Sequence, residues 1–345
     1  MKKIFCYLLI AFWAFSVATR SQEYPELKLV QTIPIHSVSA RFDHFAIDLT
    51  RMRLFLPAEE NHSLEIIDLR KGEMIHSIPG FEKAHAVYYR PDTNEFLVSD
   101  DNGICKIFRG DSFDLIKDIR LTLDYADGLR FDPESNLAYV VNAHKSAEGA
   151  PRFSYLAIID TKNWEHVGDI KIEGDRIEGV AIEPSGSRLF LDVSGRHEIG
   201  LVSRDKRTQV GAWQYSAEGV PYAAVLDRVG HRLLVALRRP AALMVLDSDS
   251  GKMITSMPTK EGIDDIYFDS ARHRIYLSAG VVGSTEGYIV VFKQIDPDHY
   301  EPEGTISTGG SSPTSLFVPE LNRYYIAVQS HGAKEAEVQV YEVKP

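Results

Sequence analysis

The chain has 345 residues with a formal net charge of −11, and 44% of its residues are hydrophobic and 25% charged. These proportions are typical of a soluble globular protein and exclude collagen-like, disordered and polytopic membrane proteins. The net negative charge makes nucleic acid an unfavourable partner, because phosphates attract basic surfaces. Two cysteines are too few for a disulfide framework or a Cys₄ zinc site. Length alone favours about two domains.

The N-terminal segment has the pattern of a secretory signal peptide. Lys2 and Lys3 precede an apolar run of 15 residues, Ile4 to Ala18, which ends in small residues. A membrane-spanning helix needs about 20 residues. We predict a signal peptide at residues 1–18, with an uncleaved anchor as the alternative. The mature chain is then periplasmic or secreted, has no membrane span, and keeps Cys105 as its one cysteine.

The rest of the chain repeats one unit seven times. Each unit contains an apolar strand that runs into a turn at an acidic or proline-containing site. The last residues of these strand–turn joints are 42 to 51 positions apart: Asp48, Arg90, Asp132, Glu183, Asp227, Asp269 and Pro319. Four short strands at a period of about 40–50 residues are the signature of a β-propeller.

Each joint is followed by two further strands, such as 53–56 and 64–68 in the first unit. A fourth strand closes six units, and the seventh unit lacks one. The missing strand is found at the other end of the mature chain, at residues 29–33. The sequence therefore predicts an all-β, seven-bladed β-propeller of four-stranded antiparallel blades, closed by the N-terminal strand pairing into the last blade. Seven units of about 45 residues use the whole mature chain, so residues 19–345 are expected to form a single domain and a monomer.

One unit resembles a known repeat. Tyr139-Val140-Val141-Asn142, followed by residues 156–161 and by Val167-Gly168-Asp169-Ile170, resembles the YVTN-type repeat of periplasmic YncE-like propellers, and residues 179–186 look like its opening turn. The resemblance extends over nearly the whole mature chain through its repeat pattern. More distantly, the chain is similar to the SMP-30/gluconolactonase group. That likeness implies a metal-dependent hydrolase with carboxylate and asparagine ligands at the mouth of the channel.

Polar side chains recur five positions before each joint, where the innermost strand begins. They are Asp43, His85, Asp127, Glu178, Tyr222, Asp264 and Thr314. We expect these seven positions to surround one mouth of the central channel. His44, which follows the first of them, is expected to point to the opposite face of its strand because side chains alternate along a strand. The aspartates at the joints are expected to bond turn amides.

The loops after the second strands reach the same mouth. They contribute Glu59, Asp100, Asn142, His144, Asp192, Arg238, Arg239 and His331. Oxygen ligands suit Ca²⁺ or Mg²⁺, and an added histidine suits Zn²⁺ or Mn²⁺. We take Asp43, Asp127, Glu178, Asp192 and Asp264 as candidate metal ligands, with Ca²⁺ or another divalent cation as the candidate cofactor.

The other candidates concern catalysis and ligand binding. His85 is the candidate general base. The candidates for ligand binding are Asp100, Asn142, His144, Tyr222, Arg238, Arg239 and His331. The sequence leaves two functions open. One is a module that binds a small molecule or a protein at the polar mouth, and the other is a divalent-metal-dependent, lactonase-like hydrolase. In a third interpretation, these polar groups cap backbone amides and hold water in the channel.

Overall fold

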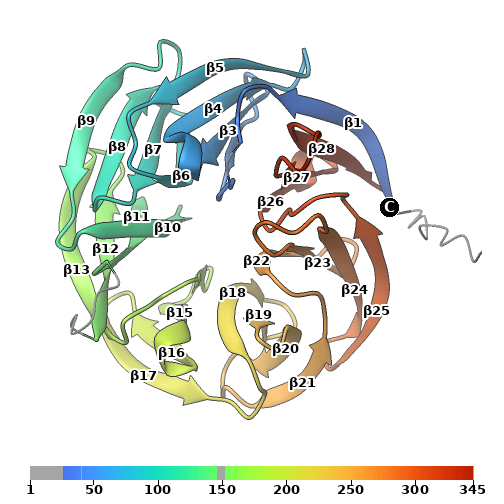
Figure 1. The fold of residues 1–345 in the computed structure, drawn as a ribbon. Coiled ribbons are helices and arrows are strands. Elements are labelled where there is room, and N and C mark those ends of the chain that lie inside the picture. Colours follow the sequence, from blue (N-terminus) through green and yellow to red (C-terminus); the bar gives the residue numbers. More distant parts are fainter. Residues whose placement is uncertain (1–25, 40, 146–151, 345) are drawn as a thin grey trace, which may run out of the picture.

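The computed structural model describes residues 26–39, 41–145 and 152–344. Within them, seven four-stranded antiparallel sheets form the blades of a ring (Figure 1). The predicted seven-bladed β-propeller is therefore confirmed. The predicted signal peptide, residues 1–18, lies outside the described residues. Within the described ranges, no helix is long and apolar enough to cross a membrane.

In six blades, strands that follow one another in sequence lie side by side from the channel outward, and in the last blade β1 takes the outermost place beside β28 (Figure 1). The innermost strands are β2 (Ala46–Asp48), β6 (Ala84–Arg90), β10 (Tyr125–Asp132), β14 (Val180–Ile182), β18 (Val220–Asp227), β22 (Ile263–Asp269) and β26 (Ser315–Val318). The second strands are β3 (Arg53–Ala58), β7 (Glu95–Asp100), β11 (Leu137–Ala143), β15 (Arg188–Val193), β19 (Arg232–Arg238), β23 (Arg274–Ala279) and β27 (Arg323–Val328).

The third strands are β4 (Ser63–Asp68), β8 (Ile104–Arg109), β12 (Phe153–Asp160), β16 (Glu198–Ser203), β20 (Ala242–Asp247), β24 (Tyr288–Asp296) and β28 (Ala336–Val343). The outermost strands are β5 (Glu73–Pro79), β9 (Leu115–Arg120), β13 (Glu165–Glu173), β17 (Thr208–Gln214), β21 (Met253–Pro258), β25 (His299–Ser307) and β1 (Leu27–Ile35). Among the described residues, three single-turn 3₁₀ helices join strands: η1 (Glu59–Asn61), η2 (Ser194–Arg196) and η3 (Pro319–Leu321).

The N-terminal strand closes the ring as predicted. Strand β1 pairs antiparallel with β28, with Leu27 opposite Val343 and Ile35 opposite Ala336. Ile33 and Ile35 are fully buried and join a core cluster with Leu54 of β3 in the first blade. Strand β1 therefore completes the last blade and packs it against the first, which removes an exposed sheet edge.

Packing between blades explains why the second and third strands are apolar without strict alternation. All six residues of β3 are buried, because a neighbouring blade covers each face of its sheet. The outermost strands are mostly exposed. The joint aspartates bond turn amides as expected, and Asp48 accepts hydrogen bonds from the backbone N–H groups of Thr50 and Arg51, both at 3.0 Å.

Ring closure predicts unequal effects of two substitutions in β1. Ile33→Ala removes a fully buried side chain and should lower the free energy of unfolding by about 2–5 kcal/mol. Val30→Ala, at a side chain that is 44% exposed, should change it by less than about 0.5 kcal/mol. Urea denaturation followed by tryptophan fluorescence measures both. Equal, small losses would show that β1 does not hold the ring closed.

Candidate functional site

Side chains from six blades line one cavity at a mouth of the channel. This inner pocket has a volume of about 160 Å³ and includes six of the seven equivalent positions at the starts of the innermost strands: Asp43, His85, Asp127, Glu178, Tyr222 and Asp264. The seventh, Thr314, is buried, and its hydroxyl donates a hydrogen bond to the carbonyl of Phe42 at 3.2 Å. The strand starts therefore converge, as the geometry of the fold requires.

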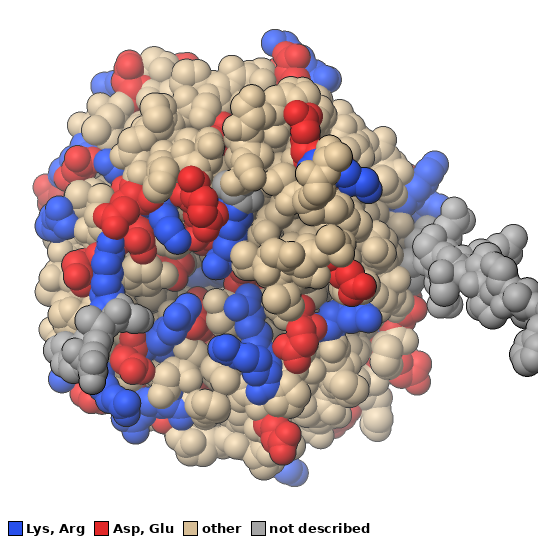
Figure 2. Space-filling view, in the orientation of Figure 1, with Lys and Arg blue, Asp and Glu red and all other residues tan. Residues whose placement is uncertain are grey.

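A wider cavity of about 1290 Å³, the outer pocket, continues from the inner one. The two share the side chains of Arg41, Arg176, Glu178, Tyr222 and Asp264. Figure 2 shows lysine and arginine side chains gathered around the hollow at the centre of this face. Of the predicted ligand-binding residues, the outer pocket includes His144, Tyr222, Arg238 and Arg239.

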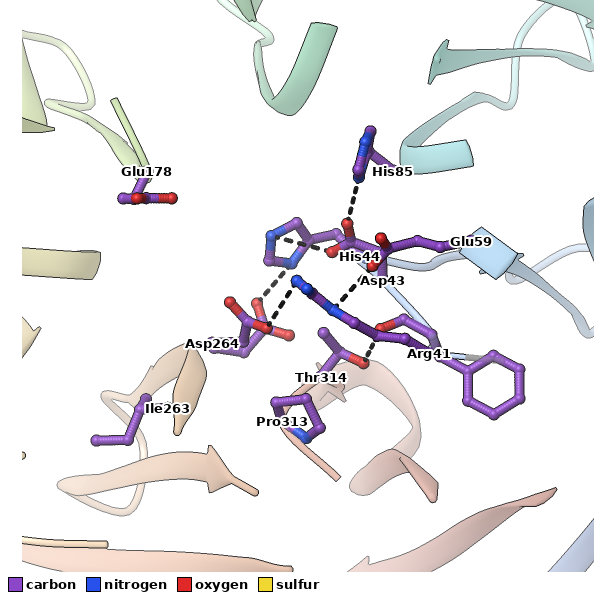
Figure 3. A network of polar contacts seen from close by, with 12 residues as sticks. Arg41, Asp43, His44, Glu59, His85, Glu178, Ile263, Asp264, Pro313 and Thr314 are labelled. Atoms are coloured by element: carbon purple, nitrogen blue, oxygen red, sulfur yellow. Dashed lines mark hydrogen bonds and ion pairs between the residues drawn. The ribbon is translucent and has the colours of Figure 1, made fainter. Parts of the chain in front are cut away.

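Asp43 and His85 form the first charged pair of the inner pocket (Figure 3). The Nδ1–H group of His85 donates to the Asp43 carboxylate at 2.8 Å, and both residues are buried. Burial opposes ionisation of Asp43, but nearby cations, led by His44 and His85, outweigh it and lower its pKa to about 2. Burial also opposes the His85 imidazolium, yet the surrounding carboxylates, Asp127 first, raise the pKa of His85 well above its usual value. Both shifts favour the ionised forms of the pair, an aspartate and an imidazolium.

Glu59, on η1, lies beside this pair. One ligand atom from each of Asp43, Glu59 and His85 can be chosen so that all three atoms lie within 4.8 Å of one another. Burial, with the Asp43 charge, raises the pKa of Glu59 to about 8. The Glu59 Oε1 atom lies 2.9 Å from Nε of Arg41, and its other oxygen lies 3.7 Å from the Lys83 ammonium.

Basic side chains are placed among the carboxylates. Arg41 bridges Glu59 and Asp264, whose Oδ2 lies 3.9 Å from its Nη2 (Figure 3). Arg176 forms an ion pair with the buried Glu178. Two of the predicted carboxylates, Glu178 and Asp264, therefore have arginine partners that lie outside the seven recurring polar positions.

These cations follow a pattern that is visible in the sequence. Arg41, Lys83 and Arg176 stand two residues before Asp43, His85 and Glu178 respectively. The i−2 position, which is basic in these three blades, is the sequence signal for these cations.

Asp264 and Tyr222 lie on the side of the mouth that belongs to the fifth and sixth blades. Arg238 Nη2 lies 2.9 Å from the Asp264 carboxylate, and its guanidinium carbon lies 3.2 Å from the centroid of the Tyr222 ring. A cation over an aromatic face is attracted by the ring quadrupole. Burial raises the pKa of Asp264, and the two neighbouring arginines, Arg238 and Arg41, oppose that shift.

Glu178 has a buried acidic neighbour, Asp192, at the end of β15. Glu178 accepts a hydrogen bond from the Ser194 hydroxyl at 2.9 Å. Asp192 is completely buried, and neither of its oxygens has a hydrogen-bond partner among the described residues. Burial, followed by the charge of Glu178, raises its pKa to about 8. A Cβ on Gly179 would lie 2.2 Å from Asp192 Oδ2, so the carboxyl lies behind that glycine and does not line either pocket.

His44 corrects the expectation from strand alternation. It lines the inner pocket, and its Nδ1 lies 3.0 Å from the Asp265 carboxylate. Strand β2 begins only at Ala46, so strict alternation does not apply at His44. Burial lowers the pKa of His44, but the charges of Asp265 and Asp43 outweigh burial and raise this pKa to about 10.

Three other predicted ligand-binding residues do not line either pocket. Asp100 accepts hydrogen bonds from the backbone N–H groups of Glu82 and Lys83, at 2.8 and 2.9 Å. The Asn142 side chain accepts from the Leu123 N–H group at 2.8 Å and donates to the carbonyls of residues 123 and 125. His331 packs against Gly310, where an added Cβ would lie 2.6 Å from its Nδ1. Asp100 and Asn142 hold the loops before the innermost strands, as in the third interpretation of the sequence.

Comparison with known proteins assigns the chain to no family. No model of a known protein family matches the chain, and no curated protein matches it.

The buried carboxyl of Asp192 predicts a pH dependence of stability. Because its folded-state pKa exceeds the unfolded value, the folded chain keeps a proton that the unfolded chain releases, and stability falls as the pH rises from about 4 to about 8. Asp192→Asn should remove this fall, which amounts to about 3–4 kcal/mol between pH 5 and pH 8 at about 1.36 kcal/mol per pKa unit. Urea midpoints at pH 5 and pH 8 measure it, with the exposed Asp205→Asn as control. An unchanged pH profile in Asp192→Asn would contradict the assignment.

Proposed function

We propose that this propeller is a binding module that holds a small polar ligand in its inner pocket. One observation carries the proposal: six blades deliver ionisable or phenolic side chains to a single cavity that continues into a wide outer pocket. Such convergence of polar groups in a concave site is what orients a small ligand. The network offers hydrogen-bond acceptors at Asp43 and Asp127 and donors at Arg41 and Tyr222.

The buried groups also argue for a ligand. His85 Nε2 is buried without a hydrogen-bond partner among the described residues, and the Asp101 carboxylate lies 3.6 Å from it. An unpaired buried polar group costs about 1–3 kcal/mol, so a network selected only for stability would pair it. A ligand hydroxyl or carbonyl oxygen in the inner pocket would accept a hydrogen bond from this N–H group.

Two further statements belong to the proposal. We infer an exported protein, periplasmic or secreted, from the signal-peptide pattern of residues 1–18. We also infer a YVTN-type repeat, since Tyr139-Val140-Val141-Asn142 falls within β11 and residues 156–160 fall within β12, the strands that the repeat pattern assigns to them.

Filling the inner pocket tests the binding function. Gly128 lines this pocket outside the left-handed φ region, and an added Cβ would meet only the carbonyl oxygen of Glu178, at 3.5 Å. Gly128→Leu should therefore fold and occupy the cavity. A panel of neutral sugars, amino acids, carboxylates and phosphates is screened by ligand-observed NMR. We expect at least one class to bind, and to bind about tenfold or more weakly to Gly128→Leu.

The matched control is Gly211→Leu, on the outer strand β17, where an added Cβ would meet only the Leu201 side chain, at 3.8 Å. It should bind like the wild type. Absence of binding by the wild type, or equal binding by Gly128→Leu, would overturn the proposal.

A second candidate function is a divalent cation site. Among the described residues, Asp43, Glu59 and His85 form one group of three potential ligands close enough to share an ion. Carboxylates with one imidazole suit Zn²⁺ or Mn²⁺. The fit requires that Arg41 and Lys83 leave Glu59 and that His85 lose its proton. A bound cation would supply Lewis-acid chemistry, and the resemblance to lactonases would make a lactone its substrate.

Thermal unfolding with added metals tests this candidate. Zn²⁺ or Mn²⁺ at about 100 times its Kd should stabilise the fold by about 2.7 kcal/mol through mass action, and EDTA should reverse the shift. Glu59→Gln should abolish the shift, and Glu320→Gln, at an exposed residue on η3, should keep it. If neither ion nor Ca²⁺ or Mg²⁺ shifts the wild-type midpoint, the group is an internal ion-pair network without a cation.

A further inference from the structure

The outer pocket is basic although the chain is acidic. Five arginines and four carboxylates line it, a formal excess of one positive charge, against −11 for the whole chain. The arginines are Arg41, Arg152, Arg176, Arg238 and Arg239, and the carboxylates are Asp175, Glu178, Glu261 and Asp264. Figure 2 shows this basic rim around the central hollow.

Most of these charges are already paired. Arg176 pairs with Glu178, Arg238 with Asp264, and Arg41 with Glu59 and Asp264. Glu261 accepts a hydrogen bond from the backbone N–H group of Ala241 at 3.0 Å.

Two arginines of the rim remain available. Arg152 and Arg239 are exposed, and neither forms an ion pair with a carboxylate of the described residues. Of the lining carboxylates, Asp175 and Glu261 have no arginine partner among the described residues, and Glu261 accepts the Ala241 N–H group instead. The site for an anion is therefore local, at the two unpaired guanidinium groups. A guanidinium presents paired N–H donors that match the two oxygens of a carboxylate.

The rim is also partly apolar. Val281 and Val282 line the outer pocket with exposed fractions of 55% and 58%. Val220 and Pro313 line it as well. Exposed valines that border an arginine-lined cavity provide a surface for a hydrocarbon group next to a site for an anion. An inorganic anion would use only the arginines.

We propose that the outer pocket binds an organic carboxylate with a short hydrocarbon tail, the carboxylate at the unpaired arginines Arg152 and Arg239 and the tail against Val281 and Val282. This inference rests on the proposed binding function, because it names the chemical class that the outer part of the mouth accepts. The cavity volume exceeds the roughly 300–1,000 Å³ of typical ligand pockets, so a small acid fits without rearrangement.

Hexanoate is the probe, and two related compounds isolate its parts. Hexanamide keeps the tail and the shape but has no charge, and acetate keeps the charge without the tail. By ligand-observed NMR titration, hexanoate should bind at least tenfold more tightly than either. Raising NaCl from 50 to 500 mM should weaken hexanoate binding, because salt screens exposed charges.

Paired variants locate the site. Arg152→Gln/Arg239→Gln should weaken hexanoate binding roughly twofold to thirtyfold, since each of the two exposed charge pairs contributes about 0.2–1 kcal/mol. The control Arg228→Gln/Arg109→Gln removes the same charge from two exposed side chains, at the β18–β19 turn and on β8, and should bind like the wild type. Val281→Ser/Val282→Ser should weaken hexanoate and leave acetate unchanged.

The outcomes separate the two proposals. Equal binding of hexanoate and hexanamide, no salt dependence, or full binding by Arg152→Gln/Arg239→Gln would overturn the inference. If a neutral sugar binds the inner pocket and Gly128→Leu abolishes that binding while hexanoate does not bind, the binding function stands and the carboxylate inference fails. If no compound binds the wild type, both fail.

Discussion

The pairing of β1 with β28 is the constraint on which the rest of the structure depends. It joins the two ends of the described chain into one blade and packs Ile33 and Ile35 against the first blade. With the ring closed, each innermost strand begins at the same face, and no blade can tilt without disturbing its two neighbours. The ring therefore holds side chains that are 42 to 51 residues apart in sequence within one pocket of about 160 Å³. The positions of the side chains at the mouth are therefore fixed by apolar packing between the blades.

The balance of charges then determines which ligands the mouth of the channel can bind. A ring of bare carboxylates would attract a cation, but Arg41, Lys83 and Arg176 enter from the segments that precede the strands and pair with Glu59, Glu178 and Asp264. Buried charges are costly unless they are paired, and Glu59, Glu178 and Asp264 each have a cationic partner. Farther out, Arg152 and Arg239 have no carboxylate partner among the described residues. These two guanidinium groups favour a polar or anionic molecule over a highly charged cation.

The fold could be predicted from the sequence because repetition is a strong signal: seven apolar joints, each with its turn aspartate or proline, leave one architecture. Strand starts were predictable for the same reason, and Asp43, His85, Asp127 and Glu178 meet as the repeat requires. Pairing was harder. Asp100 and Asn142 looked like ligands but bond loop amides, and Asp192 lies behind Gly179. All three stand near the ends of second strands, and position in a repeat does not say whether such a side chain turns toward the channel or toward a neighbouring loop. Arg41 and Arg176 stand outside the recurring positions, in the segments that precede β2 and β14.

The central claim is that the mouth of the channel is a ligand site whose rim selects a carboxylate. A crystal structure of the mature chain soaked with a bromine-labelled hexanoate tests it most directly, since anomalous scattering places the tail without ambiguity. The account predicts a bromine peak beside Val281 and Val282 and a carboxylate within hydrogen-bond distance of Arg152 or Arg239. A peak confined to another face of the propeller, or a carboxylate held by neither arginine, would contradict it.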